Sequence, residues 1–179
     1  METKQQNVIV SYGLMGSVIS VLSFVLLYFA GASAFVNPLA WGLIVIPITM
    51  MVLACRAQKK QQEGFLTFSE ALKIAFGVAV IMALVSSVCN YVVFNFIDVP
   101  FRERLQQLMM EKSESMMRKF GAPQDQIDKA IQKMANDNQY SLANTLKGFA
   151  FVCIFWFIVA LIVAAIVKKK KPEFPGAGS

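Results

Sequence analysis

The sequence predicts an all-α membrane protein with four transmembrane helices and an extramembrane amphipathic helical hairpin between the third and the fourth. Of the 179 residues, 56% are hydrophobic and only 16% are charged, whereas soluble domains carry about 25% charged residues. The mean hydropathy is +0.55. Charged residues are absent from the whole stretch between Lys4 and Arg56. Such a composition favours a membrane protein over a large soluble core.

The first predicted span is the apolar run from Val8 to Ala30. At 1.5 Å per residue, a helix of about 23 residues crosses the roughly 30 Å hydrocarbon layer with some tilt. A cleaved signal peptide is the alternative, because Ala30-Gly-Ala32 and Ala32-Ser-Ala34 resemble small-residue cleavage sites. The run is longer than the core of a typical signal peptide, and only one basic residue precedes it. We therefore favour a membrane span.

The second predicted span runs from Leu39 to Cys55 and ends at Arg56. Pro47 lies in its middle, so we expect a kink there and an unpaired carbonyl near residue 43. We interpret the kink as a packing feature, with a transport hinge as the alternative. A basic, glutamine-rich loop over residues 56–63 is expected to follow the span.

The polar hinge from Glu63 to Lys73 separates the second span from the third. Thr67 and Glu70 match the Thr-x-x-Glu pattern of a capping box, in which each side chain bonds the backbone amide of the other. Such a cap contributes about 1 kcal/mol in water, and it satisfies amides that lipid could not. Lys73 lies one turn further on, where it can pair with Glu70. The hinge is predicted to start the third span at a fixed depth and rotation.

The third predicted span covers residues 71–97 and carries a stripe of small residues at every fourth position. The stripe consists of Ala71, Ala75, Ala79, Ala83 and Ser87. A neighbouring helix can approach such a flat stripe closely. The pairs Gly13–Ser17 and Gly16–Ser20 give the first span a similar face. We therefore expect the first and third spans to form a close pair.

Residues 98–145 carry equal numbers of basic and acidic side chains and are predicted to leave the membrane. Asp98 is expected to cap an amphipathic helix from Pro100 to Phe120, and a second helix is expected from Pro123 to Ala135. These helices form a hairpin, at about 100–135, that is too small for a core of its own. Its apolar faces should meet each other, the bilayer or a partner. Half of the methionines lie here: Met109, Met110, Met116, Met117 and Met134.

The fourth predicted span, residues 146–167, is followed at once by four lysines: Lys168, Lys169, Lys170 and Lys171. This cluster and the uncharged 31–38 loop predict that both termini face the cytoplasm. The lysines are also candidate contacts for anionic lipids. We expect one membrane domain over residues 1–171, followed by a flexible C-terminal tail at 172–179.

Two segments of the chain carry a family resemblance. They are Gly64-Phe-Leu-Thr-Phe-Ser-Glu-Ala-Leu-Lys73 and, after about two dozen apolar positions, Tyr91 and Asn95-Phe-Ile-Asp98 with Pro100. In these residues and in the order of its features, the chain resembles the bacterial membrane family called domain of unknown function 4199. Val99 departs from the pattern, because it separates Asp98 from Pro100. The resemblance implies an integral protein of the bacterial inner membrane and supplies no activity.

The residue types at membrane depth favour a structural role over chemistry. The chain has no histidine and shows no phosphate-binding glycine loop or pair of carboxylates inside a span, so we expect no enzyme activity, cofactor or metal. Cys55, Cys89 and Cys153 lie in apolar runs and are interpreted as small hydrophobes. The candidate polar membrane site consists of Asn90, Glu70 and Lys73.

The expected function is therefore a structural or accessory role in a membrane, with a small transporter or channel subunit as the alternative. The lipid bilayer is the first expected partner, because basic residues flank the apolar segments. The same arrangement argues against nucleic-acid binding. The methionine-rich hairpin is a candidate surface for a protein partner, because methionine side chains adapt to varied shapes.

Overall fold

The computed structural model describes residues 2–137 and 139–169, and every element assigned within them is a helix. Four stretches of these helices are long and apolar enough to cross a membrane: Gln5–Ala30, Pro38–Gln61, Phe68–Ile97 and Leu142–Val167. The predicted all-helical class with four candidate spans is thus confirmed. The chain has the architecture of a multi-pass membrane protein. The position of the hairpin outside the membrane stays a prediction.

The chain divides into two compact units. The first unit comprises Met1–Ser17, Val45–Ala83 and Val152–Ser179, and the second comprises Val18–Ile44 and Leu84–Phe151. Three helices, α1 (Glu2–Ala30), α4 (Phe68–Val92) and α7 (Leu142–Val167), contribute residues to both units. The expected single membrane domain over residues 1–171 stays a prediction.

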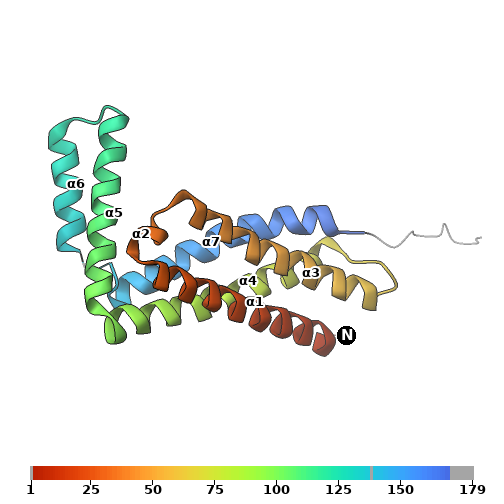
Figure 1. The fold of residues 1–179 in the computed structure, drawn as a ribbon. Helices are drawn as coiled ribbons and strands as arrows, with labels where there is room; N and C mark the ends of the chain where they lie inside the picture. The colour runs from red at the N-terminus through yellow and green to blue at the C-terminus, as the bar shows by residue number, and fades with distance from the viewer. Residues whose placement is uncertain (1, 138, 170–179) are drawn as a thin grey trace, which may run out of the picture. The chain divides into compact units, whose positions relative to one another are not determined.

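The first unit contains a core built from its segments of α1, α4 and α7 together with α3 (Val45–Gln61). These segments run alongside one another (Figure 1). Met51, Ile74 and Val78 are fully buried there. The core is rich in small and flexible apolar side chains, which let helices approach and fill the remaining gaps.

Glycines bring α1 close to α4 in the first unit. A Cβ added at Gly13 would lie 2.9 Å from Ile81 Cβ, and one added at Gly77 would lie 2.8 Å from Ile9 Cγ2. Ordinary carbon contacts are about 3.5–4.0 Å long, so neither position has room for a side chain without a shift. The expected close pair of the first and third spans is therefore present in this unit.

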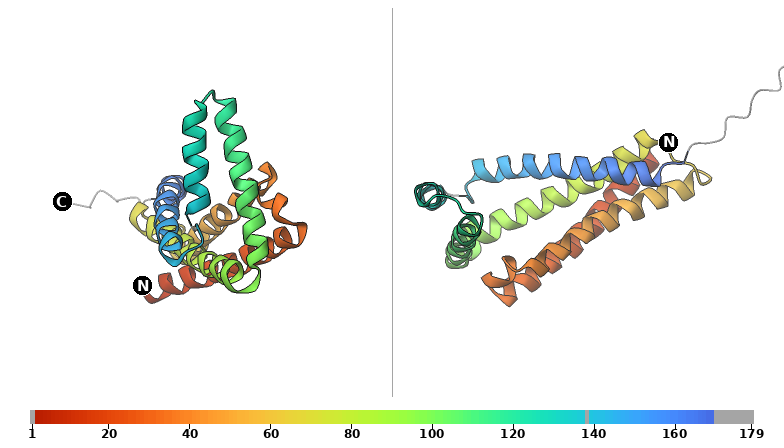
Figure 2. Two further views of the ribbon diagram at one scale, coloured as in Figure 1. Left: turned by 90° about the vertical axis from the view of Figure 1, so that its left-hand side faces the viewer. Right: turned by 90° about the horizontal axis from the view of Figure 1, so that it is seen from above.

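The second unit is built around the turn between α4 and a helical hairpin. After α4 the chain forms a π-helical turn, η2 (Val93–Ile97), and then the hairpin helices α5 (Val99–Lys119) and α6 (Gln124–Asn136). The two hairpin helices run side by side, and the hairpin extends across the direction of the adjoining parts of α4 and α7 (Figures 1 and 2). Short helix α2 (Ala32–Phe35) packs against α5.

Pro47 does not lie in the interior of an α-helix, as the sequence predicted, and the kink there stays a prediction. The chain forms a 3₁₀ helix, η1 (Pro38–Ile44), and α3 begins only at Val45. Pro47 therefore lies in the first turn of α3. A first-turn residue has no intrahelical acceptor for its amide, so proline is tolerated there.

The predicted loop over residues 56–63 is also largely wrong, because α3 continues through the basic residues to Gln61. The helix ends in a Schellman-type turn, in which the Gly64 amide donates to the Lys59 carbonyl over 2.9 Å. Glu63 and Gly64 adopt φ of 55° and 88°. The left-handed backbone is costly for a side chain but not for glycine.

Candidate functional site

The capping residues of the hinge form a complete hydrogen-bonded box at the start of α4. The Thr67 amide donates to Glu70 Oε2 over 3.0 Å, and the Glu70 amide donates to Thr67 Oγ1 over 3.3 Å. The Thr67 hydroxyl also donates to Glu70 Oε2 over 2.7 Å. The second carboxylate oxygen, Oε1, accepts from Gln62 Nε2 over 3.2 Å. Both oxygens of Glu70 are thus engaged, which locks the rotation of the first turn of α4.

The predicted ion pair between Glu70 and Lys73 does not form. No ion pair joins these two described residues, and the Lys73 side chain is exposed. Gln5 of α1 instead reaches this turn, because its side-chain amide lies 3.5 Å from the Glu70 carbonyl oxygen. The hinge is therefore held by hydrogen bonds from Thr67 and Gln62 to the Glu70 carboxylate.

The residues after α7 pair with the hinge. Leu66 and Lys169 exchange two backbone hydrogen bonds, of 2.9 and 2.8 Å, as an isolated antiparallel bridge. The ammonium groups of Lys168 and Lys169 lie 5.7 Å from the ring centroids of Phe68 and Phe65, respectively. Cations at this distance are attracted to aromatic faces. Lys170 and Lys171, the rest of the predicted lysine cluster, lie outside the described residues.

The small-residue stripe of α4 is buried through most of its length. Ala71 and Ala75 are 0% exposed, and Ala79 and Ala83 are buried as well. Ser87, the last member, is only partly buried. The stripe is therefore a packing surface in the first unit.

A polar joint forms where α4 leads into the hairpin. Asp98 caps α5, because its Oδ1 accepts from the Phe101 amide over 2.9 Å, and its Oδ2 accepts from the Tyr28 hydroxyl over 2.6 Å. The Tyr28 hydroxyl, and after it the Phe101 amide, holds the pKa of the Asp98 carboxyl below its ordinary value. Pro100 follows in the first turn of α5, where its missing amide costs nothing.

Asn95 ties the entry of the hairpin to its exit. Its side-chain amide donates to the carbonyls of Tyr91 and Tyr140 over 2.9 and 3.0 Å, and its oxygen accepts from Arg102 over 3.3 Å. Tyr140 precedes α7, so one side chain links the end of α4 to the segment that returns from the hairpin. Burial raises the pKa of the Tyr140 phenol, and the charge of Arg102 partly offsets that rise.

Aromatic rings surround this joint. Phe94, which is 4% exposed, stacks on Phe101 with a centroid distance of 6.1 Å and meets Tyr140 edge-on at 5.0 Å. Phe24 and Phe35 contact Phe94 from α1 and α2. Aromatic pairs of this kind contribute about 0.5–1.5 kcal/mol beyond their buried area. The aromatic contacts therefore fix the base of the hairpin against α1 and α2 in the second unit.

Further hydrogen bonds hold the hairpin beyond this base. Gln106 of α5 donates to the Met134 carbonyl of α6 over 3.1 Å, and the Lys112 ammonium donates to the Val36 carbonyl after α2. Several apolar side chains of α5 remain uncovered, because Met109, Met116 and Phe120 are 41%, 52% and 85% exposed.

Asn90, the deepest residue of the predicted polar site, lines a cavity of about 90 Å³ in the second unit together with Ser20 and Ser86. A cavity of this size has room for a few water molecules. Glu70 and Lys73 belong to the first unit. The three residues of the predicted polar site therefore do not come together within one unit.

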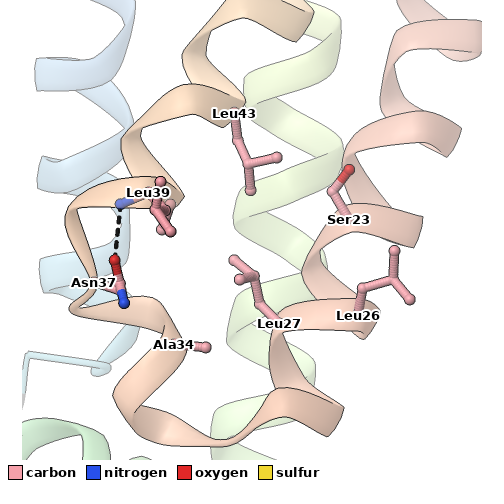
Figure 3. Close-up of a pocket in the computed structure, with 8 residues that line it drawn as sticks. Ser23, Leu26, Leu27, Ala34, Asn37, Leu39 and Leu43 are labelled. Atoms are coloured by element: carbon pink, nitrogen blue, oxygen red, sulfur yellow. Dashed lines mark hydrogen bonds between the residues drawn. The ribbon is translucent and has the colours of Figure 1, made fainter.

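The second unit also contains an apolar pocket of about 340 Å³ between the end of α1, α2 and η1 (Figure 3). Leu27 and Leu43 line it from α1 and η1. Its polar side chains have backbone partners, because Ser23 donates to the Ile19 carbonyl and Asn37 accepts from the Leu39 amide. The wall of the pocket is therefore mainly apolar and has few polar groups available to a ligand.

The hinge and the joint at Asp98 are the segments in which the sequence resembles a known family. A family model described as "Protein of unknown function (DUF4199)" matches residues 11–169. The chain belongs to the DUF4199 family. No curated protein and no solved structure matches the chain. Within the part of the chain that the structure describes, no group of three or more His, Cys, Asp or Glu side chains could hold a metal ion.

In this DUF4199 protein the sequence did not indicate the partners of three important side chains. Tyr28 meets Asp98 from 70 positions away, and Lys59 donates to the Val167 carbonyl from 108 positions away. Asn95 was visible only as part of the family segment. The only local signal for each of these three residues is a polar side chain near the end of a helix. Such a signal does not identify a partner that is distant in the sequence.

Proposed function

We propose that this DUF4199 protein is a non-enzymatic accessory protein of the bacterial inner membrane, with both termini in the cytoplasm. In this proposal the four helices anchor the chain, and the hairpin of α5 and α6 lies on the outer side, where it presents a surface to a protein partner. The lysines at 168–171 hold the C-terminal end at the anionic inner surface.

The firm base of the hairpin is the observation that carries this proposal. Asp98 and Asn95 hold its entry and exit in place by hydrogen bonds to Tyr28 and Tyr140. A segment held this firmly can present side chains in a fixed position. Met109 and Met116 are exposed on it, and exposed methionines suit adaptable binding surfaces.

The carboxylates at the starts of α4 and α5 have structural roles, so their presence does not indicate a catalytic site. Glu70 accepts from the Thr67 amide just before α4, and Asp98 accepts from the Phe101 amide in the first turn of α5. Such capping is a sufficient reason for an acidic residue at these positions. The small cavity at Asn90 likewise gives the transporter alternative little support, because a permeation route needs a continuous polar path.

Photo-crosslinking from the hairpin in bacterial membranes tests the proposal. A photoreactive residue at Met116, on the exposed apolar face of α5, should give a discrete protein adduct, and the matched control at Gln132, exposed on α6, should not. Asn95→Ala removes the side-chain hydrogen bonds at the base of the hairpin and should therefore lower the crosslinking yield at Met116. Adducts with lipid alone, or equal adducts at both positions, would contradict a partner at this surface.

A further inference from the structure

A groove between α3 and α7 in the first unit combines an apolar wall with a cationic end. It has a volume of about 480 Å³ and is lined by Val52, Arg56 and Lys59 of α3 and by Ile162 and Ile166 of α7, among others. Ligand pockets typically measure about 300–1,000 Å³. Both cations belong to the last two turns of α3, and the lining side chains that precede them in α3 are aliphatic.

The Lys59 ammonium is fixed at the cationic end. It donates to the Val167 carbonyl over 2.8 Å, and this carbonyl belongs to the last turn of α7, where it has no intrahelical donor. An ammonium group has three donors, so two remain for a ligand. The bond places the positive charge of α3 at the C-terminus of α7, where the helix dipole also favours a cation.

Among the described residues, the ion pairs Arg118–Glu114 and Lys129–Asp125 do not involve Arg56 or Lys59. The neighbouring Lys168 and Lys169 lie over Phe68 and Phe65 instead. Arg56 is exposed, and a guanidinium can bind the oxygens of a phosphate in a bidentate manner. The end of the groove therefore suits an anion.

The length of the groove matches one leaflet of a bilayer. From Ile48 to Lys59 the helix rises by about 16 Å at 1.5 Å per residue, and half of a roughly 30 Å hydrocarbon layer is about 15 Å. Ile162 and Ile166 are 57% and 77% exposed, so the groove is open at its side. An acyl chain can lie along it while its phosphate reaches the two cations.

We propose that this groove binds one acidic phospholipid, with an acyl chain between α3 and α7 and the phosphate on Arg56 and Lys59. A hydrocarbon chain with an anion at one end matches a groove that is apolar along its length and cationic at one end. A helix from a second copy would cover the apolar wall and leave both cations unpaired. The lipid is held as an individual ligand, beyond the general attraction of the lysine cluster to an anionic surface.

Native mass spectrometry of the full chain tests this proposal, with phosphatidylglycerol and phosphatidylcholine of identical acyl chains added in equal amounts. The wild type should retain one lipid and prefer phosphatidylglycerol by about 25-fold, since each surface cation adds about fivefold in affinity for an anionic lipid. Arg56→Gln should reduce the preference about fivefold, and Arg56→Gln with Lys59→Gln should abolish it. The charge-matched control Lys129→Gln with Lys133→Gln, on exposed positions of α6, should keep it.

A bulky residue in the groove tests the contribution of the apolar wall to lipid binding independently of the two cations. Ile162→Trp fills the open side of the groove without entering the core, so it should reduce retention of both lipids while the circular dichroism spectrum stays unchanged. Equal retention of the two lipids by the wild type would overturn the proposal, and so would a full preference in Arg56→Gln, a variant of an exposed residue. A dimer that Ile162→Trp dissociates would assign the groove to a second copy instead.

Discussion

Adding one methyl group to α1 at Gly13 should destabilise the first unit measurably. A Cβ at this position would lie 2.9 Å from both Cβ and Cγ2 of Ile81, about 0.6 Å closer than the shortest ordinary carbon contact. The Ile81 Cβ is attached directly to the backbone of α4, so the clash cannot be relieved by rotating a side chain. Either α1 or α4 has to shift, and such overpacking costs about 1–3 kcal/mol.

The magnitude is best measured against a glycine that has space around it. Gly148 lies within α7 and an added Cβ there meets nothing within 4 Å. Both substitutions exchange glycine for alanine inside a helix, which by itself gains about 1 kcal/mol. The difference between Gly13→Ala and Gly148→Ala therefore isolates the clash, and we expect Gly13→Ala to be less stable by about 1–3 kcal/mol.

Equilibrium unfolding in mixed detergent micelles provides the assay. Gly16→Ala is an informative third variant, because its Cβ would meet mainly the flexible end of Met82, at Sδ and Cε. Its cost should fall between those of the other two variants. If Gly13→Ala proved as stable as Gly148→Ala, the close approach of α1 and α4 would be refuted.

Three further predictions concern the hinge, the stripe and the joint. Thr67→Ala should lower the free energy of unfolding by about 1 kcal/mol through loss of the cap, whereas an equal loss from Ser69→Ala, outside the box, would argue against a specific role. Ala79→Leu and Ala83→Leu should each destabilise the bundle in the same unfolding assay by about 1–3 kcal/mol through overpacking, and unchanged stability would remove the stripe as a contact. Because hydrogen bonds depress the pKa of Asp98, its stabilisation is present above the ordinary carboxyl pKa of about 3.9 and is lost as the pH falls through the lower folded value. Melting temperatures of wild type and Asp98→Asn should therefore differ at neutral pH and converge below about pH 4, and a constant difference would contradict the Tyr28–Asp98 bond.

The long apolar runs and the caps were readable from the sequence because their causes are local. Thr67 and Glu70 are three positions apart and form the expected box. The stripe from Ala71 onward follows the helical period, so its burial could be predicted once the helix was located in the sequence. Asp98, followed by Pro100, likewise marks the start of α5, where the helix begins at Val99.

The misplaced boundaries and the missing contacts have tertiary causes. No local pattern indicates that the residues before Pro47 form a 3₁₀ helix, and for this reason Pro47 lies in the first turn of α3 and not in the middle of an α-helix. The basic residues after Cys55 looked like a loop by polarity, yet they extend α3, and Lys59 there finds its partner at the end of α7. The contacts of Tyr28 and Asn95 also depend on how distant segments return to each other, which no local pattern encodes.

Cysteine accessibility in intact bacteria directly tests the proposed position of the hairpin on the outer side of the membrane. Cys55, Cys89 and Cys153 are first replaced by alanine, and single cysteines are then introduced at Ser115 on α5 or at Gln61 at the end of α3, both exposed. A membrane-impermeant maleimide should label Ser115→Cys in intact cells and Gln61→Cys only after lysis. Protection of Ser115→Cys together with labelling of Gln61→Cys in intact cells would contradict the proposed topology.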